Sequence, residues 1–200
     1  MALYVVGAGG AGRETLDVAL ASGAGAAGFL DDRLAGSTVR GLPVLAPSEA
    51  PAGAAFVIGI ADPAARRRLA GLLVAQGLEV ATVVHPRAVI GPDTTVGPGC
   101  VVMAGAHVSS SVRLGAHVHV QYNATVGHDA VLSDFVTVYP GANVAGTVRL
   151  DEDVTVGSNA VILQNLGVGR GTFVGAGAVV TRDVGERLVV VGVPARARSG

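Results

Sequence analysis

Apolar residues recur every six positions through the second half of the chain, a period that fits neither an α-helix nor a simple alternating strand. From Ile90 to Val180 every sixth residue is Val, Ile or Leu, and the residue four positions after each of these is always small or aliphatic. This period fits a short strand followed by a turn, and hexapeptide repeats are typical of β-helices. Three hexads would make one triangular coil of eighteen residues, so residues 90–185 predict about five coils stacked ~4.8 Å apart.

The first 84 residues have a different rhythm, in which short apolar segments alternate with helical patterns. We expect strands at residues 3–6, 26–30, 56–60 and 80–84, a short strand or turn at 41–45, and helices at about 13–21 and 63–76. Asp62 and Pro63 mark the start of the second helix, because Asp is favoured at the N-cap and Pro at the first helical position. The alternation predicts a small parallel sheet. The expected fold is therefore a Rossmann-like α/β domain over residues 1–84 and a parallel β-helix over residues 85–200.

Composition supports a narrow, repetitive interior. Glycine accounts for 30 of the 200 residues, aromatic residues for 4%, and tryptophan is absent. A net charge of −1 with 14% charged residues excludes a disordered polyelectrolyte and offers no basic surface for nucleic acid. All basic residues other than histidine are Arg, so no lysine is present for a Schiff base or a Walker motif.

The expected location is cytoplasmic. No stretch of ~18 apolar residues predicts a membrane span. The N-terminus lacks the basic region of a signal peptide. The single cysteine, Cys100, falls in an inward column and is interpreted as a small core residue, and one cysteine without an internal partner fits a reducing compartment.

A glycine-rich loop follows the first expected strand. Gly7, Gly9 and Gly12 form a G-x-G-x-x-G pattern, and Asp31 ends the next strand. Such a loop lets backbone N–H groups approach a phosphate at a helix N-terminus. Only one mononucleotide-sized half is present, which favours a nucleotide-bearing or sugar-bearing substrate over NAD and leaves a tight turn without a ligand as the alternative. The candidate acceptor-binding residues are Gly9, Gly10, Ala11, Asp31, Asp32 and Ala61.

The two halves together carry a series of motifs in a specific order. They are GAGGAGRE at 7–14, GFLDD at 28–32, GLPVL at 41–45, HPRAVIGP at 85–92, HDAVLSDF at 128–135, PGANVAG at 140–146, GAGAVVTRDV at 175–184 and VVVGVPAR at 189–196. In these motifs the chain resembles the bacterial hexapeptide-repeat sugar acetyltransferases, which include sialic acid O-acetyltransferases and the N-acetyltransferases of UDP-4-amino sugars and GDP-perosamine. The resemblance implies a left-handed β-helix, although parallel crossovers are normally right-handed. It also implies a homotrimer with acetyl-CoA bound between neighbouring β-helices.

Acyl transfer from a thioester needs a base for the acceptor and a donor for the oxyanion. His128 lies at a turn position and is followed by Asp129, and Gly146 lies eighteen residues, or one coil, further along. The residues alone leave two interpretations open, a general base or a surface turn histidine beside a solvated Asp. The resemblance implies that His128 is the base, that Asp129 orients it, and that the Gly146 N–H faces the acyl oxygen.

The other histidines do not predict a metal site. His85 lies at the domain junction, where a structural role is expected. His107, His117 and His119 fall at different offsets within the eighteen-residue coil, so they share no face of the β-helix. No metal is expected.

The resemblance also implies contacts to CoA. Ser158 and Ala176 are eighteen residues apart and share a column near the pantetheine arm, Thr137 takes the place of a residue that touches CoA, and Pro194 lies in the segment near the adenine. Ordinary turn packing is the alternative for each of them.

Several departures from the family pattern gather on the acceptor side. Ala11, Ala61, Gly127 and the segment 121–123 replace residues that are usual in the family. The donor is therefore better specified than the acceptor, for which a nucleotide-linked amino sugar is the first expectation. A non-sugar acceptor, such as an amino acid or a secondary metabolite, and a non-catalytic trimeric binding module are the alternatives. The His128–Asp129 pair argues against the binding module, and the sequence does not separate N- from O-acylation.

Overall fold

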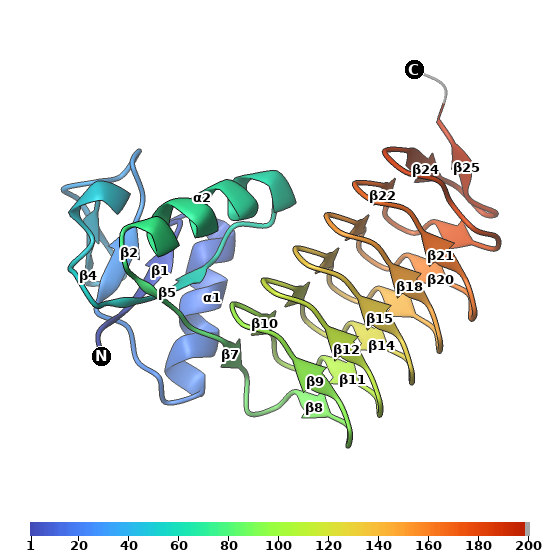
Figure 1. Ribbon diagram of the computed structural model, residues 1–200, viewed down its shortest axis with the longest axis horizontal. Helices are drawn as coiled ribbons and strands as arrows, with labels where there is room; N and C mark the ends of the chain where they lie inside the picture. Colours follow the sequence, from blue (N-terminus) through green and yellow to red (C-terminus); the bar gives the residue numbers. More distant parts are fainter. Residues whose placement is uncertain (199–200) are drawn as a thin grey trace.

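The computed structural model describes residues 1–198 and contains an amino-terminal α/β domain followed by a β-helix (Figure 1). The elements of the first domain are β1 (Leu3–Val6), α1 (Gly10–Ala21), β2 (Gly28–Leu30), β3 (Thr38–Val39), β4 (Leu42–Leu45), a short 3-10 helix (Pro47–Glu49), β5 (Ala55–Ile58), α2 (Pro63–Ala75) and β6 (Glu79–Val80). They form a six-stranded sheet in the order β3-β4-β2-β1-β5-β6, parallel except for the β3–β4 pair. No helix in residues 1–198 combines the length and the apolar character needed to cross a membrane.

The two helices differ in how their N-termini are capped. Asp62 caps α2, since its Oδ1 accepts a hydrogen bond from Ala65 N at 2.7 Å, and Pro63 is the first helical residue, as predicted. Helix α1 begins at Gly10, three residues earlier than predicted, because its first turn belongs to the glycine loop and carries no apolar signal. Gly9 is the N-cap of α1 and offers no side chain to cap it.

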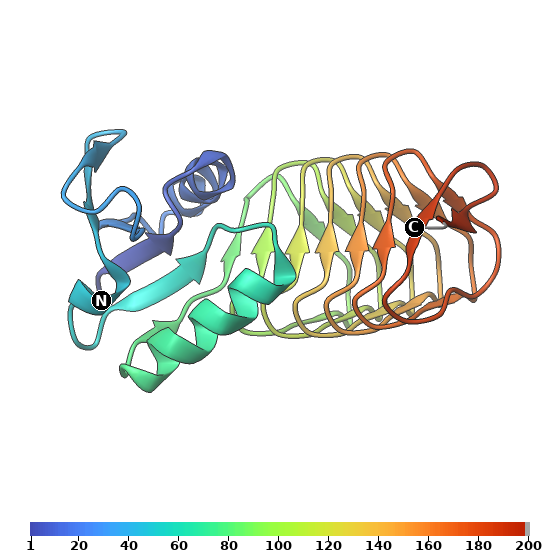
Figure 2. The same cartoon turned by 90° about the horizontal axis from the view of Figure 1, so that it is seen from above.

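The β-helix is built from strands that are mostly two residues long and stack into three parallel faces (Figures 1 and 2). Face 1 contains β7 (Val83–Val84), β10 (Val101–Val102), β13 (His119–Val120), β16 (Thr137–Val138), β19 (Thr155–Val156), β22 (Phe173–Val174), β24 (Val189–Val191) and the antiparallel β25 (Arg196–Ala197). Face 2 contains β8 (Val89–Ile90), β11 (His107–Val108), β14 (Thr125–Val126), β17 (Asn143–Val144), β20 (Val161–Ile162) and β23 (Val179–Val180). Face 3 contains β9 (Thr95–Val96), β12 (Arg113–Leu114), β15 (Val131–Leu132), β18 (Arg149–Leu150) and β21 (Gly167–Val168).

The predicted hexad register is confirmed. Residues eighteen apart pair in adjacent coils, as in Val102↔Val120 and Val120↔Val138. Most anchor residues and their partners four positions later are buried and form one continuous core. Cys100 belongs to this core, and burial raises the pKa of its thiol to about 11, which fits a structural residue. The fold is a small Rossmann-like domain followed by a left-handed parallel β-helix.

One predicted strand is divided between the two domains. The segment 80–84 was expected to close the first sheet, but only β6 joins that sheet. β7 belongs to face 1 instead, because Val83 N donates to Cys100 O and His85 N donates to Val102 O. The one polar residue of the segment, Thr82, lies between β6 and β7 but is β-branched and common in strands, so it does not mark this change of partner.

One residue in every hexad has a left-handed backbone. Fifteen residues in steps of six, from Asp93 to Gly177, all have φ between 55° and 75°. Glycine, asparagine and aspartate account for most of them because these residues tolerate that conformation best. His117 (φ 55), Asp129 (φ 59) and Phe135 (φ 62) occupy the same position in their hexads.

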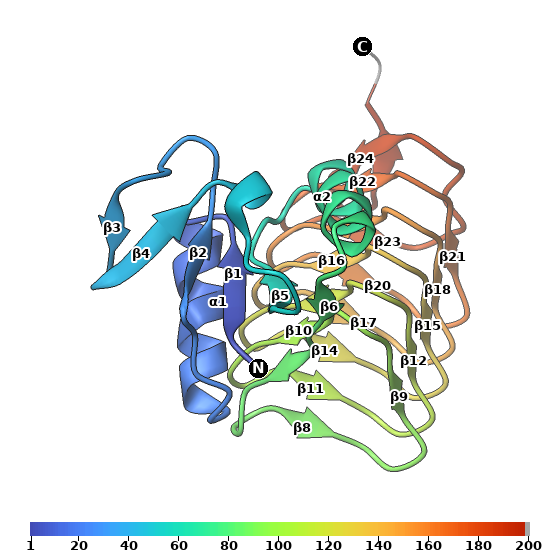
Figure 3. The same cartoon turned by 60° about the vertical axis from the view of Figure 1, so that its left-hand side comes forward.

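The amino-terminal domain packs against face 1 (Figure 3). The outward side chains of this face are therefore buried in its first coils, including Val101, His119 and Thr137. The ring of His117 stacks between Phe56 of the first domain and Phe135 of the β-helix, with ring centroids 6.4 and 5.0 Å apart. Phe173 and Val189, further along the same face, are exposed.

This interface predicts a loss of stability in acid. Burial, together with the charge of Arg66, lowers the pKa of His117 to about 4, whereas Asp134 acts in the opposite direction. An unfolded histidine titrates near ~6.5. The free energy of unfolding therefore has its full contribution from neutral His117 above pH ~6.5. That contribution is lost as the pH falls toward 4, because His117 takes up a proton more readily in the unfolded chain than in the folded one. We expect the melting temperature to fall between pH 7 and pH 4.5.

The matched variant is His117→Asn, since Asn tolerates the left-handed backbone at this position. It should be less stable than the parent at pH 7 and lose less stability over the same pH interval. Part of the slope should remain, because burial also lowers the pKa of His119. An equal slope in both proteins, measured by thermal circular dichroism, would show that His117 does not titrate in this way.

Candidate active site

His128 lies in the turn from β14 to β15, at the corner between face 2 and face 3. Its Nδ1 is 2.7 Å from Asp129 Oδ2, and the side chains are 65% and 57% exposed. An ionised carboxylate only accepts hydrogen bonds, so this contact favours the tautomer in which Nδ1 carries the proton. Nε2 then has a free lone pair directed away from Asp129, which is the state required of a general base.

Gly146 lies one coil further along, beside that nitrogen. A Cβ atom on Gly146 would be 2.6 Å from His128 Nε2, so only glycine fits without a shift of the ring. The two turns are joined by a hydrogen bond from Thr147 N to His128 O at 2.8 Å. Among the hydrogen bonds of the described chain, none uses the Gly146 N–H as donor. Gly146 thus lies beside Nε2 with its N–H unpaired among the described residues, an arrangement suited to an oxyanion.

The six predicted acceptor-binding residues line one pocket of about 440 Å³ in the amino-terminal domain. Gly9, Gly10 and Ala11 come from the start of α1, Asp31 and Asp32 follow β2, and Ala61 follows β5. The carboxyl ends of three adjacent parallel strands meet here, which is the usual ligand crevice of an open α/β sheet. The pocket also contains Arg33, Arg68, Pro47 and Leu69, which the sequence analysis did not single out.

The two aspartates of this pocket, Asp31 and Asp32, differ in their hydrogen bonding. Asp31 is occupied within the fold, because its Oδ2 accepts from Ala8 N at 2.9 Å and its Oδ1 accepts from Arg33 N at 2.9 Å. It therefore holds the glycine loop in place. Asp32 makes no hydrogen bond within residues 1–198, so its carboxylate is available to hydroxyl groups of a ligand.

The glycines of the loop also divide into two kinds. Gly12 packs against the loop backbone, since a Cβ atom there would be 1.8 Å from Gly7 O. Gly9 and Gly10 have nothing within 4 Å of such an atom and are open to the pocket. Backbone N–H groups at the start of α1 are therefore accessible to an anion, and Arg33 and Arg68 add positive charge.

Two family models match the sequence. Residues 2–73 match the PglD N-terminal domain, and residues 93–128 match the bacterial transferase hexapeptide of six repeats. No curated protein sequence matches significantly.

Several solved structures superpose over nearly the whole chain. The acetyltransferase domain of PglB from Neisseria gonorrhoeae is 34% identical, with a TM-score of 0.92 and coverage of 98% of each chain. WeeI from Acinetobacter baumannii is 32% identical, with a TM-score of 0.93 and coverage of 99% of this chain and 100% of that chain. The protein belongs to the hexapeptide-repeat sugar acetyltransferase family. The perosamine N-acetyltransferase of Caulobacter crescentus, in a complex with CoA and GDP-perosamine, is 26% identical, with a TM-score of 0.94 and coverage of 100% and 98%.

As a member of this family, the protein is an acetyl-CoA-dependent acetyltransferase that acts on a sugar. Residues 1–198 contain no group of three or more His, Cys, Asp or Glu side chains that could hold a metal ion.

One residue predicted to touch CoA does not fit that role in this acetyltransferase. Thr137 is fully buried beneath α2. Its hydroxyl donates to Ala61 O at 3.1 Å and accepts from Arg66 Nη2 at 2.9 Å. The packing of the first domain on face 1, which the hexad pattern does not encode, removes this side chain from the surface. Ser158, Ala176 and Pro194 do lie at least partly on the surface, and the hydrogen bond from Gly177 N to Ser158 O joins the first two turns.

The acceptor pocket and the candidate base lie on different sides of one acetyltransferase chain. All residues lining the pocket fall between Val6 and Leu69. Their domain covers face 1, whereas the turn with His128 joins the other two faces, near β14 and β15 in Figure 3. One chain therefore does not bring the pocket and the base together.

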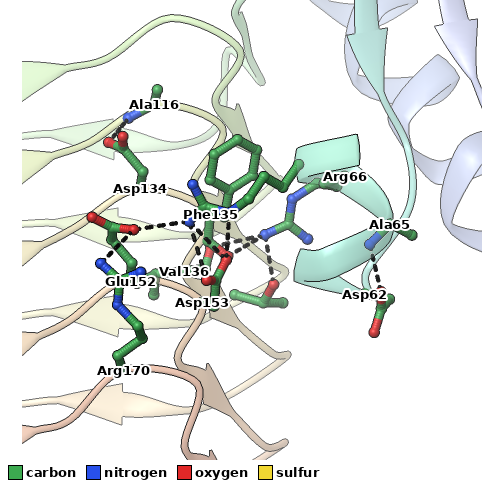
Figure 4. Close-up of polar contacts among 12 residues, drawn as sticks. Asp62, Ala65, Arg66, Ala116, Asp134, Phe135, Val136, Glu152, Asp153 and Arg170 are labelled. Carbon is green, nitrogen blue, oxygen red and sulfur yellow. Dashed lines mark hydrogen bonds and ion pairs between the residues drawn. The ribbon is translucent and has the colours of Figure 1, made fainter. Parts of the chain in front are cut away.

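The residue that connects the two domains is not among those predicted from the sequence. Arg66 of α2 is fully buried and donates hydrogen bonds to both of them (Figure 4). The only signal was three consecutive arginines at 66–68 within a helical pattern, which does not say which of them is buried.

Proposed function

We propose that the protein acetylates the amine of a nucleotide-linked amino sugar, with acetyl-CoA as donor and with His128 as the general base. The observation that carries this proposal is the hydrogen bond between His128 and Asp129 directly beside Gly146. It combines a basic nitrogen, an orienting acid and an open backbone donor at one point of the surface.

The chemistry follows from this arrangement. The acceptor amine attacks the thioester carbonyl and gives up a proton to His128 Nε2, while the new N–C bond forms. The Gly146 N–H donates to the oxygen on which negative charge develops. When the C–S bond breaks, the imidazolium returns the proton to the CoA thiolate. Asp129 stabilises the imidazolium and keeps Nδ1 protonated, so Nε2 is the nitrogen that transfers the proton.

The pocket supports the nucleotide part of the acceptor. Arg33, Arg68 and the open N-terminus of α1 suit a diphosphate, and the free carboxylate of Asp32 suits sugar hydroxyls. Ala11 and Ala61 contribute no polar side-chain atoms, so at these two positions only backbone groups can form hydrogen bonds to the acceptor. The relative from Caulobacter crescentus was crystallised with GDP-perosamine, and the PglB domain with acetyl coenzyme A.

A homotrimer would complete the site. The pocket of one chain and the His128 corner of a neighbouring chain would face each other, with acetyl-CoA between them along Ser158, Ala176 and Pro194. In this scheme residues 1–84 bind the acceptor, and residues 85–200 supply the base and hold the donor. The cytoplasmic location stays a prediction.

The first test removes the base. His128→Ala should lower kcat by at least about two decades, because a positioned base contributes ~10²–10⁴-fold. Binding of acetyl-CoA, measured by calorimetry, should change little. Asp129→Asn should have a smaller effect on kcat, since it keeps the shape but removes the charge that stabilises the imidazolium. Wild-type turnover by His128→Ala would reject the assignment of the base.

The second test separates the two aspartates. Asp32→Ala should raise the KM for the nucleotide sugar and leave the KM for acetyl-CoA unchanged, because its carboxylate is free to bind ligand. Asp31→Ala should lower the melting temperature, because it leaves Ala8 N and Arg33 N without their acceptor. The pair is matched in chemistry and differs only in hydrogen bonding. Equal effects of the two substitutions on KM and on melting temperature would contradict this division.

The third test asks whether the site forms between chains. His128→Ala lacks the base, and Gly10→Trp fills the acceptor pocket, in which Gly10 has open space. Each variant alone should be inactive. Co-expressed at equal levels, the two should recover about a quarter of wild-type activity, since about half of the pockets are intact and about half of those meet an intact base on the neighbouring chain. Mixed oligomers without activity would mean that each site lies within one chain.

A further inference from the structure

Arg66 is the largest fully buried side chain of the protein and lies between the two domains (Figure 4). Its Nη1 donates to Ile60 O at 3.0 Å and to Ala61 O at 2.8 Å. Its Nη2 donates to Phe135 O at 2.6 Å and to Thr137 Oγ1 at 2.9 Å. One nitrogen therefore binds the acceptor-pocket loop after β5, and the other binds the β-helix.

Its two neighbours in sequence have different positions because successive helical residues point in different directions. Arg67 lies over the ring of Phe135, 4.3 Å from its centroid, and forms ion pairs with Glu152 and Asp153 on the β-helix surface. Arg68 lines the acceptor pocket. Arg66 is the only one of the three that is buried, and no carboxylate pairs with it.

A buried cation that forms no ion pair has an energetic cost, which the charges of Asp62 and Asp153 offset only in part. Burial lowers the pKa of Arg66 to about 10, so it remains charged at neutral pH. Its Nε has no partner, and the nearby rings of His117 and His119 are buried as well. In proteins, well-packed apolar residues often replace buried charged groups with no loss of stability. What a guanidinium adds is a planar group that fixes several carbonyl oxygens at defined distances.

The carbonyl of Ala61 receives two hydrogen bonds, from Arg66 Nη1 and from Thr137 Oγ1 at 3.1 Å. Ile60 and Ala61 both line the acceptor pocket, and Thr137 belongs to β16. A short hydrogen-bond network, from β16 through Thr137 and Arg66 to Ala61, thus connects this part of the pocket lining to the β-helix.

We infer that Arg66 is a positioning residue, which fixes the acceptor pocket relative to the β-helix and so determines where the acceptor's reactive group meets the donor. The inference rests on the proposed function for its catalytic consequence. A misplacement of about 1 Å can cost ~10²-fold in rate even when it arises far from the reacting atoms. Loss of Arg66 should therefore reduce acetyl transfer to the sugar while binding of acetyl-CoA persists.

The experiment compares Arg66→Met with Arg67→Met, which removes the exposed arginine of the same interface. We expect Arg66→Met to lower kcat/KM for the nucleotide sugar by about 10- to 100-fold, and Arg67→Met to change it by less than about threefold. The slow hydrolysis of acetyl-CoA without acceptor should be the same in both, since water needs no acceptor pocket. A merely structural role of Arg66 would reduce hydrolysis and sugar acetylation together, and that result would overturn the inference.

Two further measurements keep the test decisive. Thr137→Val keeps the volume but removes the second hydrogen bond to Ala61 O, so it should affect acceptor turnover in the same direction even if Arg66→Met does not fold. Hydrogen exchange needs no substrate: amides of residues 59–62 should exchange faster in either variant, and those of residues 143–180 should not. Unchanged exchange at 59–62 would overturn the inference. Suppose that exchange at 59–62 is faster in the variants but the wild-type protein acetylates no nucleotide-linked amino sugar. That result would count against the proposed function alone.

Discussion

A single backbone requirement underlies the β-helix: each hexad must contain one residue in the left-handed conformation so that the chain can turn the corner of the triangle. The requirement is met without interruption from Asp93 to Gly177. It keeps adjacent coils in register at eighteen residues, and the register places small side chains over small side chains in a narrow core. The candidate catalytic residues depend on it directly, because Asp129 is one of these left-handed residues and Gly146 lies one coil beyond His128.

The same turns explain why a site can form on so regular a scaffold. The strands are occupied by hydrogen bonds along the stack, and their inward side chains are buried, so variation is confined to the outward side chains and the corners. At the corner of His128, close stacking of the coils excludes a side chain at Gly146, and the Gly146 N–H makes no hydrogen bond within the described residues. Gly146 thus meets the steric requirement of the stacked turns and is also the proposed oxyanion donor.

The sequence predicts local and periodic features well, and contacts between the domains poorly. The hexads, the Asp62 cap and the eighteen-residue step from His128 to Gly146 all follow from spacing, and the structure contains each of them. Thr137 and Arg66 could not be assigned in this way, because their environment is created when α2 packs on face 1. Likewise, nothing in residues 80–84 indicates that the chain leaves one sheet and enters another between β6 and β7. The two aspartates after β2 are equivalent in sequence and differ only in the hydrogen bonds that the folded loop gives to Asp31.

The strand β25 has a consequence for the behaviour of the protein at high concentration. A stack of parallel coils ends in unpaired backbone groups that could template the addition of further strands, as in a growing fibril. On face 1 that edge is occupied by β25, which runs antiparallel to β24 through the pairs Val190↔Ala197 and Val191↔Arg196. A further coil would have to pair in parallel, but this edge already pairs with β25, which runs in the opposite direction. Arg196 and Arg198 are exposed there. On face 1, the antiparallel strand β25 therefore blocks the addition of a further parallel coil.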